Sequence, residues 1–270
     1  MSILWSRARR RQQLLLQPFP PQWDGMLRQH VRHFQYLDAR QRSRLEGFVQ
    51  VLVAEKDWAG GGGGFTVTEE MKVTIAGYAG VMTLGLPEPY YFDRLKTIIV
   101  YPTAYLPHRS QFDIYPQYVP LAPRSGEAWH RGPVILSWAE IVEPAKRRPG
   151  SNLVIHEFAH HVDGLDGDVD GTPPINDREK GRNWYRVTEE EFERLARETA
   201  RGDVTLLDQY GATNRAEFFA VASECFFERP HAMRDRHPEL YQALADFYCQ
   251  DISGWLPDAP TVGCDSTPSP

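Results

Sequence analysis

Cysteine and long apolar runs are both scarce in this sequence of 270 residues. Its three cysteines, at positions 225, 249 and 264, form no CxxC pair, and their odd number is typical of a reducing compartment. No apolar run reaches the roughly 18 residues of a membrane-spanning helix. The leucines at 14–16 are also too few for the apolar stretch of about 7–15 residues in a signal peptide. We therefore expect a cytoplasmic protein with no membrane partner.

The chain also lacks an excess of basic charge. It has 30 basic and 36 acidic residues, which gives a net charge of −6. This balance argues against a broad basic surface, so we expect no direct contact with nucleic acid. The exception is the arginine-rich stretch 7–11 within a basic N-terminal segment, residues 1–21, which we interpret as a solvated tail.

Hydrophobic residues make up 41% of the chain, which is enough for a globular core. We expect one domain over residues 22–256, with an N-terminal helical part at about 22–90 and a catalytic part at about 91–256. Residues 257–270 are rich in proline and should form a disordered tail. The apolar periodicity predicts helices over the following approximate ranges: 22–57 in two pieces, 69–85, 151–163, 188–201, 214–228 and 239–251. The residues rich in β-branched and aromatic side chains predict two strands, 97–101 and 134–142.

The segment HEFAH, residues 156–160, carries the strongest chemical signal. On a helix, His156 and His160 lie one turn apart on the same face, where both imidazoles can bind one zinc ion. Glu157 then lies beside the ion and is placed to act as a general base on a water that the metal activates. Burying two histidines and a glutamate on an apolar helix needs a reason of this kind, because unpaired polar groups are costly there.

A catalytic zinc ion has three protein ligands, and the residues alone leave the third one open. His161 points about 100 degrees away from His160 and is a poor candidate. Asp166 would complete a HExxHxxGxxH-like pattern, but the turn glycine is Gly164, one place late. The other candidates are Glu217 and Glu224, acids on an otherwise apolar segment that predicts a later helix. The alternative for Glu224 is an acid that supports a ligand from behind or caps a helix.

An acidic turn follows the motif. Asp166, Asp168, Asp170 and Asp177 match positions of a calcium-binding loop, with a glycine at position 6. However, Pro173 interrupts the pattern and the last acid is aspartate rather than glutamate. We interpret this turn as a solvated one, with calcium binding as the alternative.

Two segments together suggest a family. IHEFAHHVDGLDG at 155–167 and YGATNRAEFFAVASECFF at 210–227 resemble the Mlc titration factor A family of bacterial zinc peptidases. That family is itself similar to the catalytic domain of anthrax lethal factor, and the GPVILSW segment at 132–138 fits the resemblance. The resemblance implies an α+β, zincin-like fold that is mainly helical, with a small mixed sheet beside the HExxH helix.

The resemblance also implies roles for individual residues. In a gluzincin-type site, His156, His160 and Glu217 would bind one zinc ion, and Glu157 would be the base. Tyr210 matches a tyrosine near the metal, and its phenol would donate a hydrogen bond to the oxyanion that forms during hydrolysis. The assignment of Glu217 depends on the local AEFFA match and not on its distance from the motif.

Further residues are expected to support this site. Asp163 lies on the ligand face of the helix and would accept the free N–H of a ligand histidine, with an ordinary helix-end residue as the alternative. An edge strand beside the metal would pair with an extended substrate backbone. The resemblance assigns that strand to these residues: Val134, Ile135, Leu136, Ser137 and Trp138. An ordinary core strand is the other interpretation.

Two functions follow from these features. The first is a zinc-dependent peptidase, aminopeptidase-like on small peptides, which would also bind a transcriptional repressor of sugar-uptake genes. The second is a repressor-sequestering protein without catalysis, in which zinc is structural or regulatory. The intact motif favours the peptidase, because a pure binding protein does not need Glu157 beside a metal.

Overall fold

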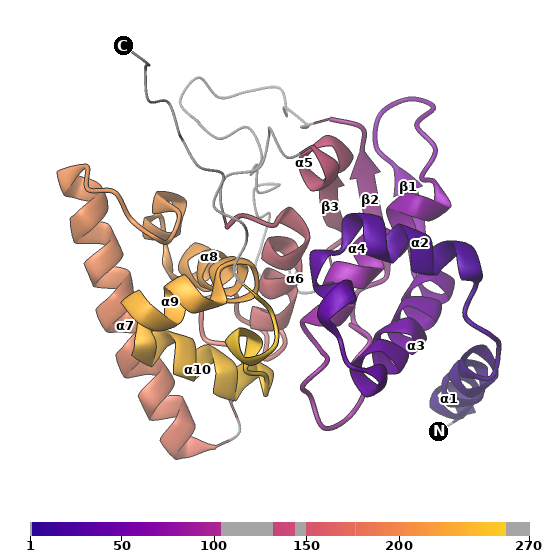
Figure 1. Ribbon diagram of the computed structural model, residues 1–270, viewed down its shortest axis with the longest axis horizontal. Coiled ribbons are helices and arrows are strands. Elements are labelled where there is room, and N and C mark those ends of the chain that lie inside the picture. Colours follow the sequence, from indigo (N-terminus) through magenta and orange to yellow (C-terminus); the bar gives the residue numbers. More distant parts are fainter. Residues whose placement is uncertain (1, 104–131, 144–149, 176, 258–270) are drawn as a thin grey trace, which may run out of the picture.

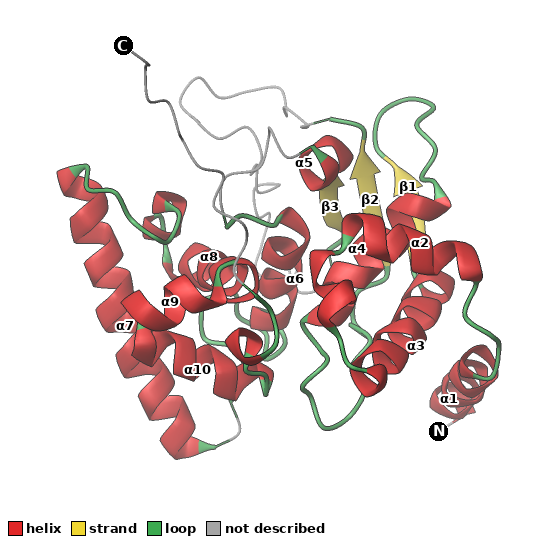
Figure 2. Cartoon of the chain, in the orientation of Figure 1, coloured by secondary structure: helices red, strands yellow, loops and turns green. Residues whose placement is uncertain are grey.

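The computed structural model describes residues 2–103, 132–143, 150–175 and 177–257 (Figure 1). Helices from the N-terminal part of the chain lie on one side of the molecule together with the sheet, and the C-terminal helices lie on the other. Two of the C-terminal helices, α6 (Leu153–Asp163) and α8 (Arg215–Glu228), pack against each other, and α6 also contacts the N-terminal group. Figure 2 shows that helices dominate and that the strands form one small sheet, which is compatible with the expected α+β class.

The N-terminal group contains four α-helices: α1 (Ser2–Leu15), α2 (Pro21–His30), α3 (Ala39–Glu55) and α4 (Glu69–Val81). Asp38 caps the start of α3 with a capping box. Its side chain accepts from Gln41 N at 2.8 Å, and the backbone N–H of Asp38 donates to Gln41 Oε1 at 3.0 Å. Glycines let α4 approach its neighbours closely: a Cβ on Gly77 would lie 2.6 Å from a methyl group of Leu27. Helix α4 therefore packs closely against α2 and α3.

Helix α1 corrects one expectation. The arginine-rich N-terminus was interpreted as a solvated tail, but it is helical and packs against α3. Arg7 and Arg11 both form ion pairs with Glu55, whose side chain is only 4% exposed. The local composition indicated a solvated N-terminal segment, because a run of arginines without nearby acids is usually exposed. The acids that neutralise Arg7 and Arg11 lie far away in the sequence, so the local pattern does not show them.

The sheet has three strands in the order β1 (Asp57–Gly60), β2 (Thr97–Tyr101) and β3 (Val134–Ser137). Both pairings are parallel, with Trp58 opposite Ile98 and Ile99 opposite Ile135. A mixed sheet was expected, whereas all strands within the described ranges run parallel. Among these strands, β3 lies at one edge and pairs only with β2.

The second predicted strand is shorter than expected. It was predicted over 134–142, but the strand ends at Ser137, and α5 (Trp138–Val142) follows at once. The N–H of Ala139 donates to Pro102 O instead of continuing the ladder, and Glu143 N donates back to Ala139 O. Trp138 therefore belongs to a short helix, with its ring 6.0 Å from that of His30, and not to the strand.

The C-terminal group is helical throughout its regular elements. Its α-helices are α6 (Leu153–Asp163), α7 (Arg178–Arg201), α8 (Arg215–Glu228), α9 (Pro230–Arg236) and α10 (Pro238–Tyr248). The start of α7 was predicted at position 188, but Asp177 caps it, accepting from Glu179 N and Lys180 N. Thr188 lies inside the helix, where its hydroxyl donates to Trp184 O.

One hydrophobic cluster runs through both groups of helices and the sheet. Phe92 and Phe158 join the groups, with ring centroids 4.7 Å apart. Within the described ranges, no helix has the length and apolar character needed to cross a membrane.

Candidate metal centre

The two halves of the candidate site begin at capped helix ends. Asn152 caps α6 by accepting from Ile155 N at 3.2 Å, and Asn214 caps α8 by accepting from Glu217 N at 3.0 Å. These caps fix where each helix starts, so HEFAH occupies the middle of α6 and Glu217 the first turn of α8. Because α6 and α8 pack together, the two segments meet.

Three side-chain atoms converge where these helices meet. His156 Nε2 lies 3.1 Å from His160 Nε2 and 3.1 Å from Glu217 Oε2. The third side of this triangle, from His160 Nε2 to Glu217 Oε2, is 3.3 Å. Among the described residues, these side chains form the one group with metal-ligand types and spacing.

The triangle fits a zinc ion. Three atoms bonded at about 2.0–2.1 Å to a tetrahedral ion lie about 3.3–3.4 Å from one another. The observed separations of 3.1–3.3 Å are close to this value. Two imidazole nitrogens and one carboxylate also form a ligand set that catalytic zinc ions use. The residues present therefore suit zinc with one coordination position left for water or substrate.

Glu224 fixes the orientation of one ligand. Its Oε1 lies 2.6 Å from His156 Nδ1, and its Oε2 accepts from the backbone N–H of Asn152. When Nδ1 of His156 carries the proton and donates a hydrogen bond to Glu224, Nε2 is unprotonated. Its lone pair then faces His160 Nε2 and Glu217 Oε2. Glu228, one turn further along α8, accepts from Asn152 Nδ2 at 2.6 Å and so joins the start of α6 to the same helix.

The electrostatics of the site favour a positive charge at its centre. Burial disfavours the charged form of His156, but Glu224 and Glu217 outweigh burial and raise the pKa of His156 to about 10. Burial also raises the pKa of Glu217, but hydrogen bonds with His156 and His160 lower it to about 2. The raised pKa of His156 reflects negative charge around it that a proton or a divalent cation would neutralise, and the lowered pKa of Glu217 shows that its histidine partners favour the carboxylate form.

Burial and neighbouring charges set the basicity of Glu157. Its carboxyl is partly buried on α6, beside His156. Burial raises the pKa of Glu157 above its ordinary value, although the two histidines oppose this, and Glu217 adds to the rise. A carboxylate with a raised pKa is a stronger base than an exposed one.

Asp163 is a buried acid on α6, and its expected bond to a ligand histidine stays a prediction. It is fully buried, and its Oδ2 accepts from the backbone N–H of Gly171 at 2.8 Å. Its Oδ1 and the Nδ1 of His160 both lack a hydrogen-bond partner among the described residues. Burial raises the pKa of Asp163 to about 7, while the Gly171 N–H opposes the shift. The bond that the structure shows therefore ties the acidic turn to α6.

Tyr210 and strand β3 lie near the converging ligands. Tyr210 belongs to a short 3₁₀ helix, η4 (Gln209–Ala212), and its ring lies 6.2 Å from that of His156. Strand β3 contacts α6 and exposes the side chain of Ile135 (36%), while Val134 and Leu136 are buried. The structure thus brings both predicted elements to the helix that carries the motif.

The remaining candidates do not join the ligand group. His161 packs against Phe92, with ring centroids 5.9 Å apart. Asp166 accepts from Asp168 N and Asp170 accepts from Thr172 N, each within its own turn. Because Asp177 caps α7 instead of facing these acids, the solvated turn is a better description than a calcium loop.

Sequence reasoning left Glu224 as either a rival ligand or an acid that supports a ligand or caps a helix, and the contacts with His156 and Asn152 fit the second interpretation. Glu224 follows Glu217 by seven residues, two helical turns along the same face of α8, and this spacing made it a rival ligand. The direction in which α8 runs against α6 decides which glutamate lies at each nitrogen of His156. Glu217 lies at Nε2, and Glu224 lies at Nδ1. That direction is not encoded in the local pattern of either helix.

The chain was compared with known proteins. The family described as Glucose-regulated metallo-peptidase M90 matches residues 5–249. The chain is 35% identical over 243 residues to the uncharacterized protein slr2042 of Synechocystis, covering 89% of this chain and 88% of that protein. It is 33% identical over 175 residues to Mlc titration factor A of Yersinia pestis, covering 63% of each chain. Mlc titration factor A of Yersinia pseudotuberculosis is similar to the same extent.

Proposed function

The chain belongs to the glucose-regulated metallo-peptidase M90 family, and from this premise we propose that it is a zinc-dependent peptidase, aminopeptidase-like on small peptides. The observation that carries the proposal is the triangle of His156, His160 and Glu217 ligand atoms with Glu157 on the same helix. A purely structural zinc site is usually closed by four protein ligands. Three ligands beside a base with a raised pKa are what hydrolysis requires.

In this proposal, His156, His160 and Glu217 hold the ion, and Glu224 keeps the lone pair of His156 Nε2 turned toward it. When bound, zinc supplies Lewis acidity, which polarises a peptide carbonyl and lowers the pKa of water. The Glu157 carboxylate takes the proton of the attacking water and delivers it to the nitrogen of the leaving amine.

Tyr210 has a separate role in the proposal. Its phenol donates a hydrogen bond to the oxygen that becomes negative when the carbonyl is attacked. The position of its ring beside His156 supports this role.

Strand β3 is the proposed binding element for the substrate backbone. It is one of the two edge strands of the described sheet, and it contacts the helix that carries the ligand histidines. An extended peptide would pair with this edge through backbone hydrogen bonds. Residues Val134–Ser137 supply the edge, and Trp138, at the start of α5, would border it rather than pair.

Glu157→Gln tests the proposed reaction. The substitution keeps the size of the side chain but removes its basicity, so we expect kcat to fall by about 10²–10⁴-fold. Zinc per chain should stay at one, because Glu157 is not a proposed ligand. The control is Glu193→Gln on α7, an exposed glutamate outside the site that should leave kcat unchanged. Hydrolysis of small peptides at the wild-type rate by Glu157→Gln protein would contradict the proposal.

A second function is suggested by one relative. The name of the Yersinia protein indicates that it titrates Mlc, and the proposed partner of this chain is likewise a transcriptional repressor. The two functions are separable with the same variant. If Glu157→Gln protein retains zinc and repressor binding while losing hydrolysis, the two functions are independent. A wild-type protein that binds repressor and hydrolyses nothing would favour the sequestering function alone.

A further inference from the structure

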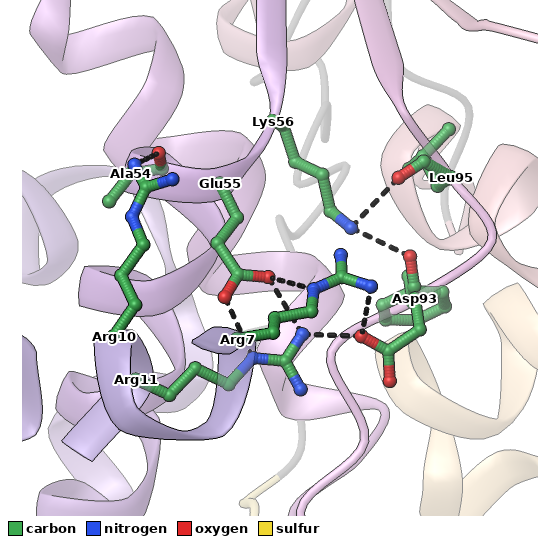
Figure 3. Close-up of polar contacts among 9 residues, drawn as sticks. Arg7, Arg10, Arg11, Ala54, Glu55, Lys56, Asp93 and Leu95 are labelled. Carbon is green, nitrogen blue, oxygen red and sulfur yellow. Dashed lines mark hydrogen bonds and ion pairs between the residues drawn. The ribbon is translucent and has the colours of Figure 1, made fainter. Parts of the chain in front are cut away.

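Helix α1 is attached to the rest of the molecule through a cluster of charges, which we name the clasp: Arg7, Arg11, Glu55 and Asp93 (Figure 3). Arg11 donates to both oxygens of Glu55, at 2.8 and 2.7 Å, and also pairs with Asp93. Arg7 bonds to Glu55 at 3.2 Å and lies 3.4 Å from Asp93. Because Glu55 is on α3 and Asp93 is in a loop, the clasp ties three segments together.

The loop that contains Asp93 is also fixed from the other side. Lys56 is buried, and its ammonium donates to Phe92 O at 2.7 Å and to Leu95 O at 2.9 Å. The guanidinium of Arg11 lies 4.4 Å from the centre of the Tyr91 ring. Residues 91–95 are therefore held through a side chain, an aromatic face and two carbonyl groups.

Phe92 has an unusual backbone conformation. Its φ is +50°, in the left-handed region that bulky residues rarely adopt, although its side chain is completely buried. A strained backbone conformation persists only where the surrounding contacts hold it. Here the Lys56 ammonium donates a hydrogen bond to the carbonyl of Phe92. The strain turns the Phe92 ring toward the metal-binding helix.

The contacts of Phe92 reach the residues beside the proposed base. Its ring packs edge-to-face on Phe158, with centroids 4.7 Å apart, and also lies against His161. Phe158 directly follows Glu157 in HEFAH. Arg94 adds a second contact by donating to Leu165 O, just beyond the end of α6. The loop thus supports α6 on the side opposite to the ligand group.

We propose that residues 91–95 buttress the metal-binding helix, with Lys56 and Phe92 as positioning residues for Glu157 and α1 as the element that holds the buttress. The proposal rests on the proposed function for its kinetic consequence only. Removing the clasp lets the loop relax, and Phe158 then loses a fixed support. Glu157 moves with it, while the three ligand side chains are still present to bind zinc.

Arg11→Gln tests the buttress, with Arg10→Gln as the matched control. Arg10 is on the same helix and donates to Ala54 O, outside the clasp. In Arg11→Gln protein, we expect faster amide hydrogen exchange at 91–95 and also within α6. With zinc saturating, kcat should fall about 3–10-fold because small displacements of a catalytic group are costly. KM and zinc per chain should not change, and Arg10→Gln should match the wild type.

Phe92→Leu provides a second test that leaves the clasp intact. It keeps an apolar side chain but removes the ring contact with Phe158, so α6 should again exchange faster and kcat should fall. If Arg11→Gln does not fold, Asp93→Asn replaces it, because the Asp93 side chain is 44% exposed and its loss is milder.

Faster exchange confined to α1 and residues 91–95, with α6 and kcat unchanged, would show that the clasp only adds stability and would overturn the proposal. If the wild type hydrolyses no peptide, the proposed function fails. The exchange of α6 in Arg11→Gln and Phe92→Leu protein then still decides whether the buttress exists.

Discussion

The candidate metal centre and the clasp each contain a buried glutamate, Glu224 and Glu55, yet the two clusters compensate buried charge differently. In the clasp, arginines face Glu55 and Asp93, so the negative charge is neutralised within the chain. In the metal centre, Glu217 and Glu224 face histidines, which carry no obligatory charge. A buried acid beside arginine indicates structure, whereas acids around converging histidine nitrogens indicate a site for a cation.

The sharpest test of this difference is to remove one acid from each cluster. Glu217→Ala should lower zinc affinity by more than about 100-fold, because one of three ligands is lost. Glu55→Ala should keep one zinc per chain but lower the free energy of unfolding by about 1–3 kcal/mol, since Arg7 and Arg11 lose their shared partner. Zinc content after gel filtration, competition with a chelator and denaturant unfolding measure the two effects. Equal zinc affinity in the two variants would contradict the distinction.

A smaller effect is expected from the acid that orients His156. Glu224→Gln should lower zinc affinity by about 10–100-fold, as outer partners of metal-binding histidines commonly do. Glu228→Gln is the matched control, because Glu228 is on the same helix and also bonds to Asn152 but does not contact His156. Chelator competition on both variants checks the prediction. A loss of affinity in Glu228→Gln as large as in Glu224→Gln would assign the effect to the α6 cap instead.

Part of the candidate site could be predicted from the sequence. The spacing of His156 and His160 follows from helix geometry alone, and the AEFFA match was enough to select Glu217. The local pattern could not decide between the two interpretations of Glu224, because the answer depends on how α6 packs against α8. Glu224 and His156 are 68 residues apart in the sequence.

The clasp was hidden for the same reason. Arg11 and Asp93 are separated by 82 residues, so the arginine-rich stretch looked solvated when read locally. The helices themselves were mostly predictable, because apolar periodicity is local. The early start of α7 is the exception, since Asp177 and not Thr188 supplies the cap.

The adjacent histidines His160 and His161 show the same contrast between a site residue and a structural residue within α6. His160 faces the ligand group, and His161 faces the N-terminal half. Burial, together with the positive charges of Lys56 and Arg94, lowers the pKa of His161 to about 4. His161 therefore behaves as a structural residue that must stay neutral.

The sign of its pH dependence follows from this shift. Between the ordinary pKa of 6.5 and the lowered value of about 4, the unfolded chain binds a proton that the folded chain does not. Stability is then lost as the pH falls through this window. From pH 7 to pH 5, His161 should account for a loss of about 1–2 kcal/mol in the free energy of unfolding.

His161→Phe should remove this part of the loss, because phenylalanine fills similar space and cannot be protonated. Denaturant unfolding with metal chelated, at pH 7 and pH 5, measures it as the difference between the wild type and the variant. Between pH 7 and pH 8 the two proteins should change in parallel, which controls for other groups. A wild type and variant that lose equal stability between pH 7 and pH 5 would mean that His161 finds a carboxylate or water when protonated. The face of α6 that carries His161 would then be nearly as polar as the face that carries His160.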